Sequence, residues 1–393
     1  MRHLIEMPIY GVLFMLITDS IWWLLIREHF TKRWSKILFW GVTFSFIIGF
    51  IVCIFTFPNI SEIKSYNLLS VIIGTLIAWY VPKILYIFIR LIGMPFTLIG
   101  EKSTKFVKGS ALLLAAILFG SCVYGFTIGR YKYKINEVEV PIENLPRGLQ
   151  GVKIVHLSDL HLGSISDSYS GIAKLVEDVN KQNADLVLFT GDFVNNVAEE
   201  ALPFIPTLKE IKARYGVYGV LGNHDYGDYH RWSSKAEKAA NLRKLIENEE
   251  QAGIKLLLNE NVKIPIGHDT LLLAGVENWG KPPFPRYGDL EKALKDRGNL
   301  TTVLMSHDPS HWQGQVIFQN VPLTLSGHTH AMQMGIQIGK FKWSPSKYLY
   351  PEYDGLYSHN GCYLNVSRGQ GYLAMPGRIG LRPSIDVITL INK

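Results

Sequence analysis

Four long apolar stretches dominate the first third of the chain and constrain its fold more than any other feature. They run approximately over Pro8 to Ile26, Ile37 to Phe57, Leu68 to Ile89 and Ser110 to Ile128. Each approaches the ~20 residues that a helix needs to cross a bilayer. A cleaved leader peptide would be a single, shorter stretch. We therefore expect a transmembrane region with four helices over residues 1–130, and a multi-pass integral membrane protein in contact with the lipid bilayer.

The positive charges between these stretches predict their orientation. The second loop has only Lys64. The first loop contains Arg27, Lys32, Arg33 and Lys36, and the third contains Arg90, Lys102, Lys105 and Lys108. Short loops rich in Lys and Arg stay on the cytoplasmic side. This rule places both ends of the four-helix region, and the domain that follows, outside the cytoplasmic (inner) membrane. The basic residues Arg130, Lys132 and Lys134 favour the opposite orientation.

Charge also separates the two parts of the chain. Residues 1–134 contain 14 Lys and Arg against 5 Asp and Glu, and the remainder contains 26 against 28, within totals of 40 and 33. The basic excess thus belongs to the loops of the apolar region, and the second part is nearly neutral. We therefore expect no nucleic-acid partner.

Asp19 is an ionisable residue inside the first apolar stretch. Such residues are costly in a bilayer and are functional candidates. The alternative is a carboxyl that bonds a neighbouring helix. Lys83, late in the third stretch, is long enough to extend its amine towards the interface.

The rest of the chain predicts a linker with a first strand over residues 131–150 and one α/β domain over 151–393. Apolar, mostly β-branched runs recur in this domain, as in buried parallel strands. Five of them end in polar blocks: Asp159-Leu160-His161, Gly191-Asp192, Gly222-Asn223-His224-Asp225, Ser306-His307-Asp308 and Gly327-His328-Thr329-His330. Open sheets place their chemistry beyond the carboxyl ends of strands. We therefore expect one edge of one sheet to gather these side chains.

The residue types in the blocks are those of a two-metal site. Two divalent ions can activate water and hold phosphoryl oxygens during in-line displacement. A carboxylate must bridge such closely spaced ions, and Asp192 at a strand end suits this role. Imidazole together with carboxylate ligands favours Mn, Fe or Zn over Ca or Mg. Asp159 and His161, two residues apart on an extended segment, can bind the same ion, and His328 and His330 have the same spacing.

The order of the blocks resembles that of the calcineurin-like metallophosphoesterases, over about Leu145 to Leu390. That family has two mixed β-sheets sandwiched between helices. The resemblance implies that two divalent metal ions are bound, the first by Asp159, His161 and His330, the second by Asn223, His307 and His328, with Asp192 as the bridge. It also implies a catalytic role for His224, which would give a hydrogen bond or proton to the phosphate or leaving group while Asp225 orients its ring.

The flanks Leu149 to Ile154 and Arg378 to Pro383 are similar to the membrane-tethered bacterial branch of this family, which acts on lipid-like phosphoesters. Ala331-Met332-Gln333-Met334 departs from the Gly-Gly-Gln of many relatives. Arg378 and Arg382 could grip a phosphate through two parallel hydrogen bonds, or form ordinary surface ion pairs.

The sequence therefore predicts a metal-dependent phosphoric ester hydrolase. We expect attack by a metal-bridging hydroxide on a phosphodiester or pyrophosphate bond, in a membrane lipid or lipid-linked substrate, because a membrane anchor raises the encounter rate only with membrane-bound substrates. One alternative is a broad extracytoplasmic phosphodiesterase or phosphatase acting on soluble nucleotides or phosphoproteins. Another is a membrane sensor or scaffold that uses the fold only for binding.

Overall fold

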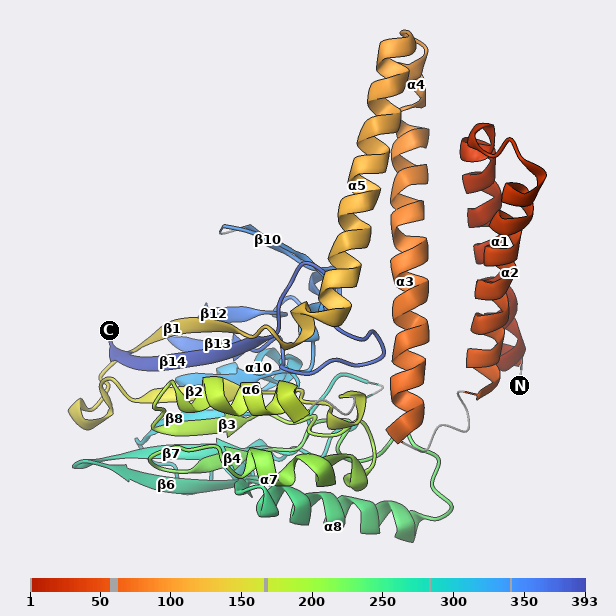
Figure 1. Cartoon of the computed structure of the whole chain (residues 1–393). Helices are drawn as coiled ribbons and strands as arrows, with labels where there is room; N and C mark the ends of the chain where they lie inside the picture. The colour runs from red at the N-terminus through yellow and green to blue at the C-terminus, as the bar shows by residue number, and fades with distance from the viewer. Residues whose placement is uncertain (1, 57–62, 166–168, 283, 340) are drawn as a thin grey trace. The chain divides into compact units, whose positions relative to one another are not determined.

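The computed structural model describes residues 2–56, 63–165, 169–282, 284–339 and 341–393 (Figure 1). The chain divides into two compact units. The helical unit comprises Met1–Thr127 with Ala374–Pro376, and the α/β unit comprises Ile128–Leu373 with Gly377–Lys393.

The helical unit contains four long helices and a one-turn helix: α1 (Arg2–Ile26), α2 (Arg33–Thr56), α3 (Ile63–Ile92), α4 (Met94–Thr97) and α5 (Glu101–Thr127). The four long helices hold segments whose length and hydropathy suffice to cross a membrane: Ile9–His29, Arg33–Phe55, Leu68–Ile92 and Glu101–Thr127. The four predicted apolar helices are thereby confirmed. The predicted end of the second stretch, residue 57, lies outside the described residues.

Asp19 on α1 is fully buried and binds two groups on α3. The Lys83 amine lies 2.6 Å from one carboxylate oxygen, and the Tyr80 hydroxyl donates to the other at 2.9 Å. The carboxyl therefore connects two helices, as the structural alternative expected. The outward extension expected for Lys83 is wrong, because its amine is buried against Asp19, its counter-ion.

The described residues of the α/β unit form two six-stranded sheets and a two-stranded hairpin. The first sheet has the order β1-β14-β2-β3-β4-β5, with bounds β1 (Lys134–Ile142), β14 (Ser384–Asn392), β2 (Lys153–Leu157), β3 (Leu186–Phe189), β4 (Val217–Gly219) and β5 (Ile254–Leu256). The second has the order β12-β13-β9-β8-β7-β6, with bounds β12 (Gly355–His359), β13 (Cys362–Val366), β9 (Leu323–Ser326), β8 (Thr301–Met305), β7 (Asp269–Gly275) and β6 (Glu260–Ile266). The hairpin pairs β10 (Ile336–Ile338) with β11 (Phe341–Trp343).

Both sheets are mixed. In the first, β2 to β5 run parallel, whereas β14 pairs antiparallel with β2 and parallel with β1. In the second, β7, β8, β9 and β13 run parallel between the antiparallel edge strands β6 and β12.

Three apolar cores fix the layers. A buried cluster between the sheets includes Ile154 and Leu188 from the first sheet and Val303 and Leu325 from the second. Helices α6 (Tyr169–Asn180), α7 (Ile205–Leu208) and α8 (Lys235–Gln251) pack on the outer face of the first sheet, and α9 (Leu290–Ala293) and α10 (Ser310–Gly314) pack on that of the second. The predicted sandwich of two mixed sheets between helices is confirmed.

The five polar blocks do not lie at the edge of one sheet, as the sequence had suggested. Strands β2, β3 and β4 of the first sheet precede three of them, and β8 and β9 of the second sheet precede the other two. The blocks still meet, because alternate residues of both sheets fill one shared core and the stacked sheets end side by side. The site therefore forms where two sheets adjoin.

Candidate metal centre

The loops that follow five strands bring the predicted ligands together. Asp159 and His161 follow β2, Asp192 follows β3, and Asn223 follows β4. From the second sheet, His307 follows β8, and both His328 and His330 follow β9. All seven side chains are almost fully removed from solvent, so each polar atom needs a partner inside the protein.

Two clusters of potential ligand atoms share one carboxylate. In the first, atoms of Asp159, His161, Asp192 and His330 all lie within 4.8 Å of one another. In the second, the same holds for Asp192, His307 and His328. Asn223 joins this second cluster, since its Oδ1 lies 3.1 Å from His307 Nε2 and 2.8 Å from His328 Nδ1. The grouping matches the two sets of ligands expected from the sequence, and Asp192 stands between them.

The donor atoms in these clusters suit divalent metal ions. His161 Nε2 and His330 Nε2 are 3.0 Å apart, and His307 Nε2 lies 3.3 Å from His328 Nδ1. Each neutral imidazole has one nitrogen with a lone pair, and such nitrogens facing one another beside carboxylates form a typical cation site. The residues present therefore fit the metals that the fold family implies.

Hydrogen bonds from the far side of two rings direct the ligand nitrogens. His307 Nδ1 lies 2.7 Å from the Thr190 carbonyl oxygen, which can only accept a hydrogen bond. His161 Nδ1 lies 3.1 Å from Asn195 Oδ1. With the proton on Nδ1, each ring keeps its Nε2 lone pair for the site. Such outer contacts fix both the tautomer and the orientation of metal-binding histidines.

His224 lies beside the bridging carboxylate. Its backbone N–H donates to Asp192 Oδ1 at 2.9 Å, and its Nδ1 lies 2.7 Å from the Asn195 carbonyl oxygen. The predicted orientation of this ring by Asp225 differs from the structure. The Asp225 carboxylate instead accepts hydrogen bonds from four backbone N–H groups, those of Asp192, Phe193, Val194 and Gly222. It therefore holds together the two loops that carry Asp192 and Asn223.

The ligand loops have unusual backbone conformations. Asp159, Asp192 and His328 adopt left-handed φ values of 53°, 54° and 69°, and His161 and His330 are also left-handed. Such conformations are uncommon for residues other than glycine and concentrate at functional sites. Gly222 allows the loops to approach, since a Cβ there would lie 2.3 Å from Asp192 Oδ1.

Burial and neighbouring charges set the protonation of the cluster. Burial alone would lower the pKa of His307, but Asp192 raises it to about 10. Burial conversely favours the neutral form of Asp192, yet His307 and His224 hold its pKa well below its usual range. Burial lowers the pKa of His161 to about 3 and that of His328 to about 4, so both rings are neutral. A divalent ion at Nε2 of His307 would take the place of the proton that the Asp192 carboxylate otherwise favours there.

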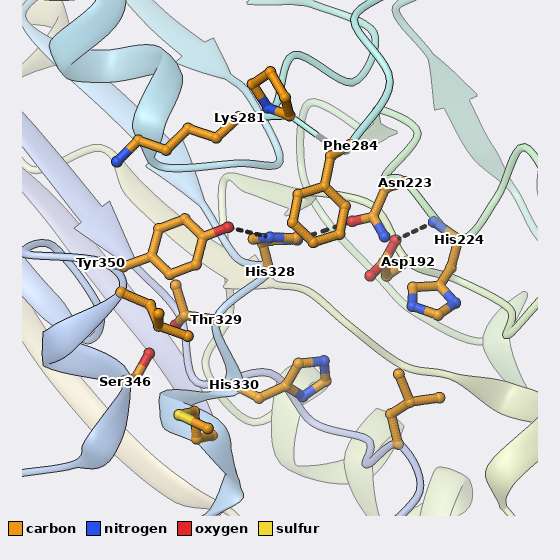
Figure 2. A pocket seen from close by; sticks show the side chains of 14 residues that line it. Asp192, Asn223, His224, Lys281, Phe284, His328, Thr329, His330, Ser346 and Tyr350 are labelled. Carbon is orange, nitrogen blue, oxygen red and sulfur yellow. Dashed lines mark hydrogen bonds between the residues drawn. The ribbon is translucent and has the colours of Figure 1, made fainter. Parts of the chain in front are cut away.

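A cavity of about 430 Å³ adjoins the cluster (Figure 2). Its lining includes Asp192, Asn223, His224, His328 and His330. Its other walls are mainly apolar and aromatic: Pro282, Phe284, Met332, Leu349, Tyr350 and Leu373, with Lys281, Thr329 and Ser346 as polar members. The Tyr350 hydroxyl lies 2.8 Å from His328 Nε2. The cavity thus combines the cluster of potential ligands with mainly apolar walls.

The two predicted substrate arginines do not line this cavity. Arg378 is buried, and its guanidinium donates to the carbonyl oxygens of His330, Arg368, Gly369 and Gly371. It therefore supports the loop of His330. Arg382 is exposed on the surface. Phosphate binding by either arginine stays a prediction.

Two residues near the ligands received no role from the sequence. Asn195 contacts both His161 and His224, but an isolated asparagine in a loop has no distinctive pattern. Asp308 follows His307 directly, and its Oδ2 is buried 3.7 Å from His328 Nε2 without a hydrogen bond among the described residues. A second carboxylate beside a predicted histidine ligand was the available signal.

Comparisons with known proteins agree with this geometry. Residues 152–332 match the family model of the calcineurin-like phosphoesterases, and residues 1–130 match that of a probable calcineurin-like phosphoesterase transmembrane domain. The chain is 32% identical over 296 residues to a "transmembrane protein with metallophosphoesterase domain" of Danio rerio, covering 71% of this chain and 62% of that protein. It is 31% identical over 295 residues to the metallophosphoesterase YkuE of Bacillus subtilis, covering 73% of this chain and 96% of that protein.

A solved structure, a phosphopantetheinyl hydrolase from Mycobacterium tuberculosis, matches 55% of this chain and 88% of its own with a TM-score of 0.32 and 12% identity, a level that does not bear on function. The two family models together account for most of the chain, and the chain covers nearly the whole length of the Bacillus subtilis relative. Both findings agree with the two-sheet fold and its histidine and aspartate cluster. The chain belongs to the calcineurin-like metallophosphoesterases, as a member with a four-helix transmembrane domain.

Proposed function

We propose that the chain is a dinuclear metal-dependent hydrolase of a phosphodiester or pyrophosphate bond in a membrane lipid or lipid-linked molecule. The observation that carries the reaction class is Asp192, whose carboxylate is common to two clusters of potential ligands. A shared carboxylate is what two closely spaced divalent ions require. Mn, Fe and Zn suit the mixed imidazole and carboxylate donors best.

Each cluster would hold one ion. Asp159, His161 and His330 would bind the first, and the second would be bound by Asn223, His307 and His328. When bound, the ions would supply an activated water and hold the phosphoryl oxygens. The protein contributes a rigid, water-poor arrangement of ligands, because outer hydrogen bonds already orient His161 and His307.

His224 would act on the phosphate or on the leaving group. Its ring lines the cavity next to Asp192, and its Nδ1 is engaged by the Asn195 carbonyl. The opposite nitrogen, Nε2, is therefore the one that could give a hydrogen bond or a proton to an oxygen of the substrate. A positioned general acid of this kind contributes about 10²–10⁴-fold to the rate.

The shape of the cavity supports an amphiphilic substrate. The rings of Phe284 and Tyr350 lie beside the ligand His328, with ring centroids 4.7 and 5.3 Å from its own (Figure 2). Met332, Leu349 and Leu373 add aliphatic side chains to the lining. Such walls fit the apolar part of a lipid phosphoester better than a sugar or a phosphoprotein loop. The membrane anchor supports the same class of substrate, because it keeps the site near molecules dissolved in the bilayer.

We further propose that residues 1–130 form the anchor, residues 131–150 link it to the catalytic domain over 151–393, and this domain lies outside the inner membrane. An even number of spans returns the chain to the side where it began. The basic loops that follow α1 and α3 favour the cytoplasm. Protease accessibility of the domain in intact spheroplasts tests this orientation.

The first experiment is hydrolysis of bis-p-nitrophenyl phosphate by the purified full-length chain with Mn, Fe or Zn. Asp192→Asn should abolish turnover together with metal binding, and His224→Ala should lower kcat with the metals retained. His230→Ala is the matched control, because His230 packs on Trp232 outside the cavity and should not matter. Full activity in the Asp192 variant would refute the dinuclear site.

The lipid assignment needs its own test. A panel of phospholipids and polyprenyl pyrophosphates in mixed micelles should include a substrate that is cleaved faster than soluble nucleotides. If no lipid phosphoester is cleaved and nucleotides are hydrolysed equally well without detergent, the substrate is soluble and the lipid assignment is wrong.

A further inference from the structure

The hairpin β10–β11 is amphipathic, and its apolar side chains, rather than its polar ones, are the exposed ones. Its register pairs Ile336 with Trp343 and Ile338 with Phe341, and residues opposite each other in an antiparallel pair share one face. The exposed fractions on this face are 49% for Ile336, 72% for Ile338 and 62% for Phe341. The apolar face of the hairpin is thus directed away from the protein.

The other face of the same hairpin is polar and attached to the protein. Gln337 accepts a hydrogen bond from Arg368 at 2.8 Å, and the Lys342 amine lies 2.9 Å from an Asp354 carboxylate oxygen. Arg368 and Asp354 are themselves buried and paired at 2.8 Å. The orientation of the hairpin is therefore fixed by specific contacts, and a simple rotation cannot bury its apolar face.

The exposed apolar side chains continue from the hairpin to the edge of the cavity. Half of the large apolar side chains that are exposed in the described part of the α/β unit belong to residues 332–339 and 341–349: Met332, Ile336, Ile338, Phe341, Tyr348 and Leu349. Met332 and Leu349 also line the cavity beside the ligands. Monomeric soluble proteins seldom gather so much exposed apolar surface without a partner.

We propose that the exposed apolar side chains of residues 332–339 and 341–349 form a bilayer-contacting surface, through which the cavity receives the apolar part of its substrate. The bilayer is the occupant we favour for two reasons. The same chain carries four helices fit to cross it, so the domain that bears this surface is tethered to a bilayer. Residues 332–339 and 341–349 also combine Ile, Phe, Trp and Tyr with exposed Lys347, the composition of protein surfaces at the membrane interface.

The entry of a lipid substrate through this surface rests on the proposed function, whereas the contact with the bilayer does not. The test measures the contact alone and does not involve turnover. Ile338→Cys is labelled with nitrobenzoxadiazole in the full-length chain, reconstituted in vesicles of phosphatidylcholine and phosphatidylglycerol. The native cysteines Cys53, Cys122 and Cys362 are all buried, and the unmodified chain gives the background signal. Phe318→Cys is the matched control, since Phe318 has the same exposed fraction, 72%, in another part of the unit.

Lipids carrying a spin label near the headgroup provide the readout. An interfacial group sits about 5–10 Å into the headgroup and acyl boundary, so the label at 338 should lose roughly half of its fluorescence, whereas that at 318 should keep its own. A second label at Tyr348→Cys should respond like that at 338. A blue-shifted but unquenched signal at 338 would show that protein, either the chain's own helices or a second copy, covers the face. That result, or equal quenching at 318, overturns the proposal.

Discussion

Replacing Asp225 by asparagine should lower the free energy of unfolding of the α/β unit by about 3–6 kcal/mol. The carboxylate is fully buried, and each oxygen accepts from two backbone N–H groups: Oδ2 from Asp192 and Gly222 at 2.8 Å each, and Oδ1 from Phe193 and Val194 at 2.8 and 3.2 Å. Asparagine keeps one acceptor and places an NH2 group against two donors. Two hydrogen bonds to a charged acceptor, at about 1.5–3 kcal/mol each, are thereby lost.

The measurement should be made at pH 8, because burial raises the pKa of Asp225 to about 7. Pulse proteolysis of the full-length chain in detergent and urea reports unfolding of the α/β unit. With a slope of about 3 kcal/mol per molar urea, the midpoint should fall by about 1–2 M. Metal affinity should fall as well, because the loop that carries Asp192 loses its support.

The matched control is Asp228→Asn, which removes a partly exposed carboxylate paired with Lys238 and should change stability by less than about 1 kcal/mol. If Asp225→Asn lowers kcat but leaves the urea midpoint and metal affinity unchanged, Asp225 acts on the His224 ring, as the sequence predicted, and the structural argument is wrong.

Four further outcomes follow. Chelation with EDTA should abolish turnover but leave the far-ultraviolet circular dichroism spectrum unchanged, with recovery on adding Mn; loss of the spectrum would show that the metals fold the site. Asn195→Ala should weaken metal binding about 10–100-fold, measured by calorimetry, because its amide oxygen faces His161 Nδ1. Burial lowers the pKa of His156 to about 3 from an unfolded value near 6.5. The free energy of unfolding is therefore highest above pH 6.5 and falls as the pH drops towards 3, by about 2 kcal/mol at pH 5. Urea unfolding of the His156→Gln variant should show a correspondingly weaker pH dependence. Lys83→Met should lower the thermal midpoint in detergent, and the double variant with Asp19→Asn should recover part of it, because a single change leaves a buried charge unpaired.

Most of the fold class and the gathering of the ligands could be predicted from local patterns. The apolar stretches predict α1, α2, α3 and α5, and runs such as Leu186 to Thr190 predict the buried strands that end at the ligands. Because a strand end fixes where the next side chain lies, Asp192 and its partners were predictable as a group. The assignment of the strands to two sheets was not, since β14 reaches β2 from more than two hundred residues away, and only the complete core selects that pairing.

The contacts that support the ligands were beyond sequence reasoning for a different reason. Asp225 accepts from backbone N–H groups, and the Thr190 backbone carbonyl orients His307; a backbone group leaves no trace in residue identity. The hairpin β10–β11 had a signal, the alternation of Ile336 and Ile338. Period-2 alternation tells which residues share a face but not which face meets the protein.

The left-handed backbone of the ligand loops links the stability of the fold to its chemistry. Left-handed residues cost about 1–2 kcal/mol each, with Asp, Asn and His at the lower end, so the five strained ligands together oppose folding by about 5 kcal/mol or more. The described structure holds these conformations with hydrogen bonds: the rings of His307 and His161 donate to the Thr190 carbonyl and the Asn195 amide oxygen, and four backbone N–H groups donate to Asp225. These hydrogen bonds offset part of the cost of the left-handed conformations, so the substitutions at Asp225 and Asn195 proposed above act on the same loops that carry the ligands.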